Sequence, residues 1–264
     1  MFNYIPWNVN PEIFHVGSLS VRWYGLLFAL GFYFGYLIMA RFFRKENVPI
    51  KELDRLTTYM VVGTIIGARL GHCMFYEPAY YLSHPLEILK IWEGGLASHG
   101  AAIGIILSIY LFSRKSSRSF LWTLDRIVIV VALAGVLIRL GNLMNSEIFG
   151  KPTDLPWAFV FIRDNMIPRH PSQIYEALAY LLTFIYLLKH YYRKNGQPRP
   201  GFLFGMFMIM IFTARFFIEF LKEPQVSFET RYWLNLGQSL SIPFVLLGIF
   251  MVWRSKKDSV PGII

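Results

Sequence analysis

Apolar segments of about membrane-spanning length recur along the whole chain, and they constrain its fold more than any other feature. A helix needs about 20 mostly apolar residues to cross the roughly 30 Å hydrocarbon core, where lipid offers the backbone no hydrogen-bond partner. The sequence therefore predicts an all-α, polytopic membrane protein with one membrane domain, residues 1–264. The seven segments, with boundaries set to within a few residues, are 18–40, 56–76, 96–113, 120–144, 172–188, 202–221 and 236–253.

The composition agrees with this interpretation. Charged residues make up only 16% of the 264 residues and hydrophobic residues 55%, whereas a soluble domain carries about 25% charged residues. The net charge of +10 lies in short clusters between apolar segments rather than along one face of a soluble helix, so nucleic acid is not an expected partner. Residues 1–17 lack the basic start and apolar core of a cleavable signal peptide, and we expect the first segment to remain as an anchor.

Lysine and arginine are distributed unequally between the connections. Those after the first, third, fifth and seventh segments hold fifteen, and the opposite connections hold six. Because basic loops are retained in the cytoplasm, the N-terminus is predicted outside and the C-terminus inside. The outer side also carries the longer connections, and residues 78–92 mix aromatic and aliphatic side chains there. That mixture indicates short helices lying in the interface, with an ordinary aromatic belt as the alternative.

The sequence offers no basis for a metal site. Cys73 is the only cysteine, so a cysteine-based metal site and an internal disulfide are excluded, and we expect a small buried apolar side chain. His99 has no second histidine close in sequence and no acidic cluster. A metal site at this histidine is therefore not predicted.

Charged residues within the apolar segments need an explanation, since each costs roughly 2.5 to 3.5 kcal/mol at the bilayer centre. Arg139 and Asn142 are three residues apart, so a helix places them on one face. Arg215 and Glu219 are four apart and would either pair along the helix or converge on one cavity. Structural pairing or snorkelling is the alternative reading of both clusters. Two arginines in one cavity would suit a phospholipid phosphate, because guanidinium groups give planar bidentate contacts to its oxygens.

Two further polar clusters stand at the outer ends of segments. His99 lies among small residues at the start of the third segment, and its ordinary pKa near 6.5 suits it to take a proton from a thiol. The alternative is a satisfied structural histidine. Before the fifth segment, Ser172 is expected to cap the helix, while Arg169, His170, Gln173 and Glu176 are expected to brace the cavity.

Taken together, these clusters resemble the prolipoprotein diacylglyceryl transferase family, from about residue 21 to residue 253. A single matching motif would carry little weight, whereas six in the right order are specific. The matching pieces are Trp23-Tyr24-Gly25, Gly67-Ala68-Arg69-Leu70-Gly71, Ser98-His99-Gly100, the run from Gly135 to Gly150 around Arg139 and Asn142, the run from Arg169 to Glu176, and Arg215 to Glu219 followed by Glu223-Pro224.

The resemblance implies transfer of the diacylglyceryl group of phosphatidylglycerol to the lipobox cysteine thiol of a prolipoprotein signal peptide. It implies a bacterial cytoplasmic (inner) membrane location, a site facing the outer side, and no cofactor, because the substrate is already activated. By match to the family motifs, His99, Arg139 and Arg215 would be catalytic. The residues expected to shape the lipid site are Tyr24, Arg69, Asn142, Asn145, Glu147, Gly150, Arg169, Gln173 and Glu219.

Four positions depart from the common family pattern. Ala101 and Ser146 stand where glycine is usual, and both look tolerable. Ile211 stands where a tyrosine is often found, and Lys222 where an arginine is often found. Roles assigned to the last two positions in relatives are not carried over to this chain.

Two other functional classes are alternatives to this interpretation. A small secondary transporter or channel for an anionic solute is the main alternative, since buried arginines also line anion pathways. Against it, the sequence contains no inverted repeat, and its polar clusters gather toward one face. An intramembrane protease is suggested by Ser98 beside His99, but adjacent residues rarely form a nucleophile and base pair.

Overall fold

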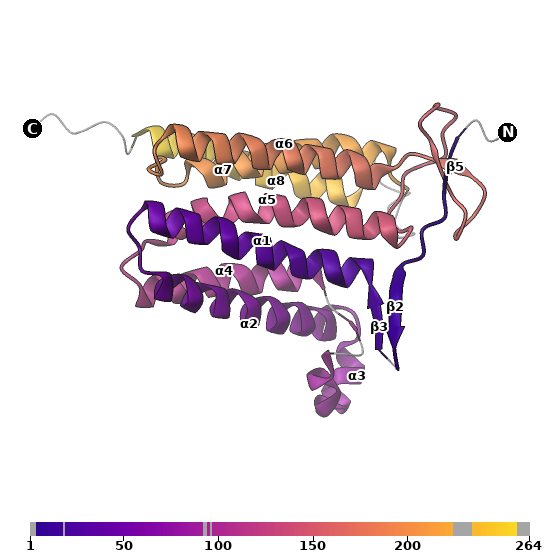
Figure 1. The fold of residues 1–264 in the computed structure, drawn as a ribbon, viewed down its shortest axis with the longest axis horizontal. Coiled ribbons are helices and arrows are strands. Elements are labelled where there is room, and N and C mark those ends of the chain that lie inside the picture. The colour runs from indigo at the N-terminus through magenta and orange to yellow at the C-terminus, as the bar shows by residue number, and fades with distance from the viewer. Residues whose placement is uncertain (1–3, 18, 92–93, 96, 224–233, 258–264) are drawn as a thin grey trace, which may run out of the picture. The chain divides into compact units, whose positions relative to one another are not determined.

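A computed structural model describes residues 4–17, 19–91, 94–95, 97–223 and 234–257. In this part of the chain a long helix lies at each of the seven predicted segments (Figure 1). Four of them, including the short 3-10 turn that extends α7, are long and apolar enough to cross a membrane by length and composition. The helices are α1 Trp23–Lys45, α2 Ile50–Phe75, α4 Ser98–Lys115, α5 Phe120–Met144, α6 Ser172–Arg193, α7 Phe202–Ile218 and α8 Leu236–Lys257.

The chain packs as two units. One comprises residues 1–38 together with 125–264, and the other residues 39–124. α1 and α5 run from one unit into the other, and each unit is described by itself below.

In the first unit, α7 packs along α8 and against α6. Gly205 of α7 and Gly248 of α8 permit the close approach, because a Cβ on either would lie under 3 Å from the carbonyl oxygen of the other. At the start of α7, the buried Asp125 of α5 accepts hydrogen bonds from the backbone N–H groups of Gly201 at 2.7 Å and Phe204 at 2.8 Å. These are N–H groups that a helix start leaves without intrahelical partners, so Asp125 ties α5 to α7.

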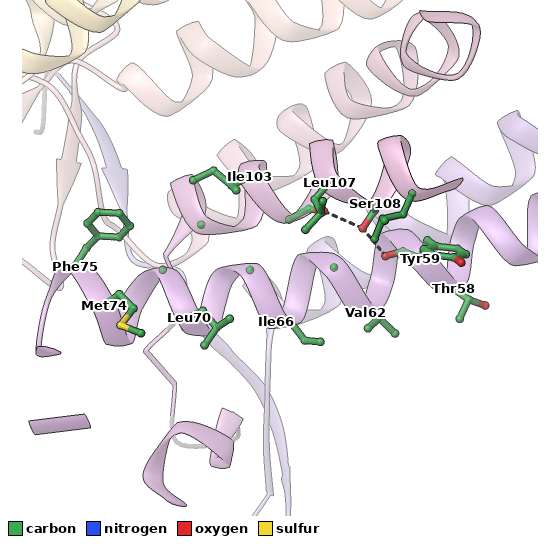
Figure 2. Close-up of a pocket in the computed structure, with 16 residues that line it drawn as sticks. Thr58, Tyr59, Val62, Ile66, Leu70, Met74, Phe75, Ile103, Leu107 and Ser108 are labelled. Carbon is green, nitrogen blue, oxygen red and sulfur yellow. Dashed lines mark hydrogen bonds between the residues drawn. The ribbon is translucent and has the colours of Figure 1, made fainter. Parts of the chain in front are cut away.

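In the second unit, α2 and α4 pack through glycines four residues apart (Figure 2). A Cβ on Gly67 would lie 2.4 Å from the carbonyl oxygen of Gly100, and one on Gly104 would lie 2.0 Å from that of Gly63. Small residues at this spacing let two helix backbones touch. Cys73 is fully buried on α2, as predicted.

An open apolar cavity of about 700 Å³ runs over this helix pair. The same glycines line it, together with rows of apolar residues spaced four apart on each helix (Figure 2). These apolar residues include Val62, Ile66 and Leu70 on α2, and Ile103 and Leu107 on α4.

Short strands that the sequence analysis did not predict occupy the connections, so the described chain is not strictly all-α. β1 Ile5–Trp7 pairs in parallel with β4 Phe159–Phe161, which pairs antiparallel with β5 Pro168–Arg169. β2 Glu12–Val16 and β3 Leu19–Arg22 form a separate hairpin. Strands of two to five residues leave too short a hydrophobic alternation to be read from sequence.

The hairpin corrects the start of the first predicted segment. Residue 18 lies outside the described residues, residues 19–22 pair as strand β3, and α1 begins only at Trp23. In the connection after α2, the chain forms two short helices, α3 Pro78–Ser83 and the 3-10 turn η1 Pro85–Leu89. They are separated at His84, because the residue before a proline is disfavoured in the helical region.

Substitution of Gly104 by alanine should weaken the pairing of α2 with α4, since the added Cβ would meet the Gly63 carbonyl oxygen at 2.0 Å. Overpacking of this kind costs about 1 to 3 kcal/mol, which lowers a thermal midpoint by about 2 to 4 °C for each kcal/mol in a chain of this size. The measurement is thermal unfolding in detergent. Gly25→Ala is the matched control, because no atom lies within 4 Å of the Cβ added there. Equal midpoints for the two variants would contradict the close pairing.

Candidate active site

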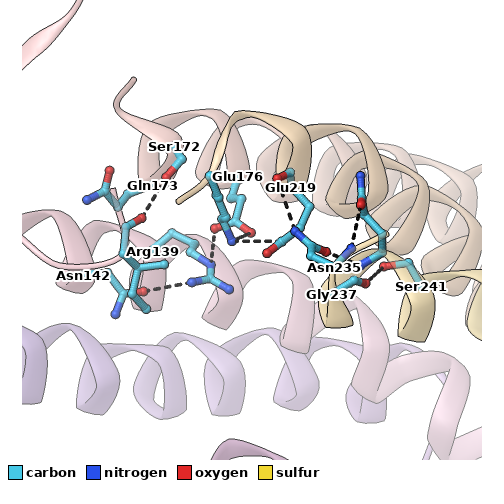
Figure 3. A network of polar contacts seen from close by, with 12 residues as sticks. Arg139, Asn142, Ser172, Gln173, Glu176, Glu219, Asn235, Gly237 and Ser241 are labelled. Atoms are coloured by element: carbon cyan, nitrogen blue, oxygen red, sulfur yellow. Dashed lines mark hydrogen bonds and ion pairs between the residues drawn. The ribbon is translucent and has the colours of Figure 1, made fainter. Parts of the chain in front are cut away.

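A buried ionic network joins α5, α6 and the end of α7 in the first unit (Figure 3). The carboxylate of Glu176 has no exposed surface, and each of its oxygens faces a different cation. Its Oε2 lies 2.9 Å from Nε of Arg139, and its Oε1 accepts a hydrogen bond of 2.9 Å from Nζ of Lys222. The same ammonium lies 3.4 Å from Oε2 of Glu219. Buried charges are tolerated when they are paired in this way.

Arg139 continues the network along its own helix end. Its Nη1 donates to Oδ1 of Asn142 at 3.2 Å, and the Asn142 amide donates to Oε1 of Glu147 at 2.7 Å. The amide of Asn145 reaches the same Glu147 oxygen at 3.3 Å. The predicted shared face of Arg139 and Asn142 is therefore confirmed, and the asparagines connect the arginine to a second carboxylate.

Tyr180 connects this network to Arg215. Its ring centroid lies 6.0 Å from the guanidinium carbon of Arg139, and its side chain interacts electrostatically with both Arg139 and Arg215. The alternative of an Arg215–Glu219 pair is not observed: within the described residues Arg215 forms no ion pair, while Glu219 faces Lys222. At Glu219 the chain passes from α7 into the 3-10 turn η3 Glu219–Leu221, which winds more tightly than an α-helix.

Tyr24 lies close to the same cluster. Its ring packs so tightly on α5 that a Cβ on Gly141 would lie 2.8 Å from Cδ2 of Tyr24. The tyrosine also interacts electrostatically with Glu147 and Arg139. The fold therefore brings Tyr24 close to Arg139 and Glu147, which are expected to belong to the same site.

The first turn of α6 fastens the chain that leaves α5. Nε2 of Gln173 donates to the carbonyl oxygen of Glu147 at 2.6 Å, and Oγ of Ser172 donates to that of Ile148 at 2.7 Å. The predicted capping role of Ser172 is wrong, since the N-cap is Pro171 and no side chain caps the helix. Within the described residues, Oε1 of Gln173 and Oδ1 of Asn145 are buried without hydrogen-bond partners. Two acceptors are therefore available near the network.

Gly150 stands where three segments of chain meet. Its N–H donates to the carbonyl oxygen of His170 at 2.8 Å, and it forms an isolated β-bridge with Lys222. A Cβ here would lie 2.6 Å from both Cβ of His170 and the carbonyl oxygen of Leu221, so only glycine fits without displacement. Partial burial lowers the pKa of the neighbouring His170 below its ordinary value.

Arg169 closes the same junction. Its guanidinium pairs with Glu223 and lies 4.8 Å from the ring centroid of Phe149. Through these two contacts, Arg169 holds the segment that carries Phe149 and the segment that carries Glu223 together. Its predicted part in lipid binding stays a prediction. The Pro224 that completes one matching motif lies outside the described residues.

In the second unit, Arg69 anchors a connection. The buried guanidinium donates from Nε to the carbonyl oxygen of Ile88 at 2.9 Å, from Nη1 to Gly94 at 2.7 Å and from Nη2 to Glu87 at 2.6 Å. All three nitrogens are engaged with backbone carbonyls. The observed role of Arg69 is therefore to hold Glu87, Ile88 and Gly94 against α2.

His99 is the second residue of α4 and is exposed. Its ring centroid lies 5.2 Å from that of Phe75 and 5.9 Å from that of Tyr76. It belongs to the unit of residues 39–124, whereas Arg139 and Arg215 belong to the other. No group of three metal-binding side chains occurs in the described part of the chain.

Two members of the network were not selected from the sequence. In the sequence, Lys222 is marked only as a departure from the family pattern, and Tyr180 lies in none of the matching motifs. Tyr180 lies four residues after Glu176, a spacing that puts both on one helix face and could have identified it. The pairing of Lys222 with Glu176 could not be predicted from helical spacing, because the two residues are 46 positions apart in the chain.

The fold and the network define a helical membrane protein with paired arginine and carboxylate groups buried between its helices. A family model described as prolipoprotein diacylglyceryl transferase matches residues 11–254. The chain is 50% identical over 253 residues to the phosphatidylglycerol–prolipoprotein diacylglyceryl transferase of Tolumonas auensis, covering 96% of this chain and 98% of the relative. The protein of the same name from Chloroherpeton thalassium is 46% identical over 258 residues, covering 97% of this chain and 96% of the relative. The one from Bacteroides fragilis is 46% identical over 269 residues, covering 97% of this chain and 97% of the relative. The chain belongs to the prolipoprotein diacylglyceryl transferase family.

Replacing Gly150 by alanine should open the junction of the three segments, because the added methyl group would press on His170 and on the backbone at Leu221. We expect a lower thermal midpoint in detergent and faster limited proteolysis between residues 150 and 170. The control is Lys151→Ala, at an exposed neighbouring position. Proteolysis of Gly150→Ala at the parental rate would show that the junction accommodates a side chain.

Proposed function

We propose that this chain transfers the diacylglyceryl group of phosphatidylglycerol to the thiol of the lipobox cysteine in a prolipoprotein signal peptide, releasing glycerol phosphate. The step would be the first in bacterial lipoprotein maturation. The observation that carries the proposal is a family match over residues 11–254, a range that includes the whole buried network. The relatives named above are transferases of this kind over nearly their full length.

The proposed reaction is a displacement at a glycerol carbon. A bond forms between the cysteine sulfur and that carbon, while the bond from the carbon to the phosphate ester oxygen breaks and its electron pair leaves with glycerol phosphate. Only the thiolate is a good nucleophile, and a cysteine with a pKa near 8.5 is mostly protonated at neutral pH, so the thiol proton must pass to a base.

His99 is the proposed base. Its exposed position at the start of α4, beside the rings of Phe75 and Tyr76, is compatible with an approaching thiol. A histidine suits this role because a neutral imidazole can accept a proton from a thiol. The alternative role for His99 is to orient the substrate without moving a proton.

Arg139 and Arg215 are proposed to offset the negative charge that develops on the departing phosphate. Their common interaction with Tyr180 supports a shared place of action. Within the described residues Arg215 has no carboxylate partner, so its charge is not cancelled by an ion pair there. The buried acceptors of Asn145 and Gln173 would suit the hydroxyl groups of a glycerol headgroup.

The remaining parts of the proposal concern the membrane. All seven long helices would cross the bacterial inner membrane as one catalytic domain, with the N-terminus and the network toward the outer side. Basic residues in the last turns of α1, α4 and α6 support this orientation, because such residues are retained in the cytoplasm. A transporter or channel is not favoured, since the relatives are transferases over nearly their full length.

Arg139→Ala and Arg215→Ala should each abolish transfer while the protein remains inserted, because each removes a positive charge from the phosphate site. Purified protein is incubated with phosphatidylglycerol and a lipobox peptide, and the diacylglyceryl mass increment of the peptide is followed by mass spectrometry. The increment should disappear when the peptide cysteine is serine. The exposed Arg41→Ala is the control and should retain activity. Full activity in well-inserted Arg139→Ala would remove the phosphate-site assignment.

His99→Gln should slow transfer at neutral pH by about 10²-fold or more, the usual contribution of a general base. Raising the pH toward 9 should recover part of the rate, because the peptide thiol then ionises without help. The measurement is the pH profile of transfer for the parent and the variant. Near-normal turnover of His99→Gln at neutral pH would exclude the histidine as the base.

A further inference from the structure

The carboxylate of Glu176 is shared between two cations. With a side chain that has no exposed surface, it pairs through one oxygen with Arg139 and through the other with Lys222, both at 2.9 Å. The Lys222 side chain is only 2% exposed, so water contributes little to its solvation. Its ammonium also lies 3.4 Å from Glu219. The four groups comprise two positive and two negative charges (Figure 3).

The backbone holds Lys222 in this place. The residue forms a β-bridge with Gly150, and the carbonyl oxygen of the preceding Leu221 accepts a hydrogen bond of 2.7 Å from the N–H of Lys151. Lys222 is therefore attached to the junction beyond α5 and is not a mobile surface lysine. A compact ammonium with three donors can serve two carboxylates at once.

The second carboxylate of the network is also confined. A Cβ on Gly237, at the start of α8, would lie 2.7 Å from Cδ of Glu219 and 3.0 Å from both of its oxygens. Glu219 is thus enclosed between the start of α8 and the ammonium of Lys222. The start of a helix carries partial positive charge, which favours the ionised carboxylate.

Removal of the Lys222 charge would reduce the positive charge of Arg139 that is available to an anionic ligand. Glu176 would then direct its whole charge to the arginine, and Glu219 would lose the one cation that it faces among the described residues. The group would change from neutral to a net charge of −1. In a site of low polarity, this added negative charge would strongly oppose binding of an anion.

We propose that Lys222 is a positioning residue for the phosphate of the anionic lipid: by sharing Glu176 and neutralising Glu219, it keeps the charge of Arg139 available to that phosphate. The inference rests on the proposed function and adds to it a specific determinant of lipid affinity. Lys222 acts through Glu176 and Arg139 and is not itself a catalytic residue.

The test uses the full chain in mixed micelles with phosphatidylglycerol and a lipobox peptide. Three variants are compared with the parent: Lys222→Met, which removes the charge at similar length; Lys222→Arg, which keeps it; and Lys222→Met with Glu219→Gln, which restores the charge balance. The readouts are KM for the lipid, kcat, inhibition by glycerol phosphate, and the thermal midpoint.

Lys222→Met should raise the lipid KM and weaken inhibition by glycerol phosphate, each by about tenfold, which corresponds to about 1.4 kcal/mol. Lys222→Arg should keep both near the parental values. The double variant should recover most of the loss, because it removes one negative charge together with the positive one. A purely structural lysine would lower the midpoint without this recovery.

Folded Lys222→Met with a parental lipid KM would overturn the proposal, as would a folded double variant no better than the single one. If Lys222→Met does not insert, the single variant Glu219→Gln is measured instead. It removes one negative charge, so inhibition by glycerol phosphate should become tighter. Unchanged inhibition would overturn the proposal. Absence of any modified peptide with the parent protein would instead reject the proposed function. The two failures are therefore distinguishable.

Discussion

The shared carboxylate of Glu176 is the interaction on which the arrangement of the candidate site depends. It has no access to water, and it pairs with one cation from α5 and one from the chain beyond α7. A buried carboxylate without such partners would be strongly unfavourable. The requirement to pair it therefore draws three parts of the chain together, and the asparagine contacts of Arg139 extend the same network to Glu147.

Close backbone contact is what allows polar groups to be arranged this accurately in an apolar protein. Gly205 and Gly248 bring α7 against α8, and Gly150 lets three segments of chain meet. Without a hydrophobic driving force between helices in lipid, such small residues and polar contacts supply much of the specificity. Among the glycines of the family motifs, Gly67, Gly100 and Gly150 therefore have direct packing roles, whatever they contribute to substrate binding.

The helices and much of the candidate site were predictable from local sequence. The hydropathy pattern located all seven helices, and helical spacing correctly put Arg139 beside Asn142. The same spacing argument allowed Arg215 to pair with Glu219, but the chain turns into a 3-10 helix at Glu219 and its carboxylate faces Lys222. Arg69 is expected to help shape the lipid site, and that stays a prediction. Its guanidinium is engaged by backbone carbonyls that no sequence pattern marks.

The sequence by itself determined the class of protein, the positions of its apolar helices and the set of charged residues that must be sheltered from lipid. Those properties follow from composition and from periodicity over a few turns, which are local. Only the tertiary structure decided which cation takes which carboxylate and which arginine holds a loop. Such choices depend on contacts between residues far apart in the chain, such as Lys222 with Glu176, and helical periodicity carries no information about them.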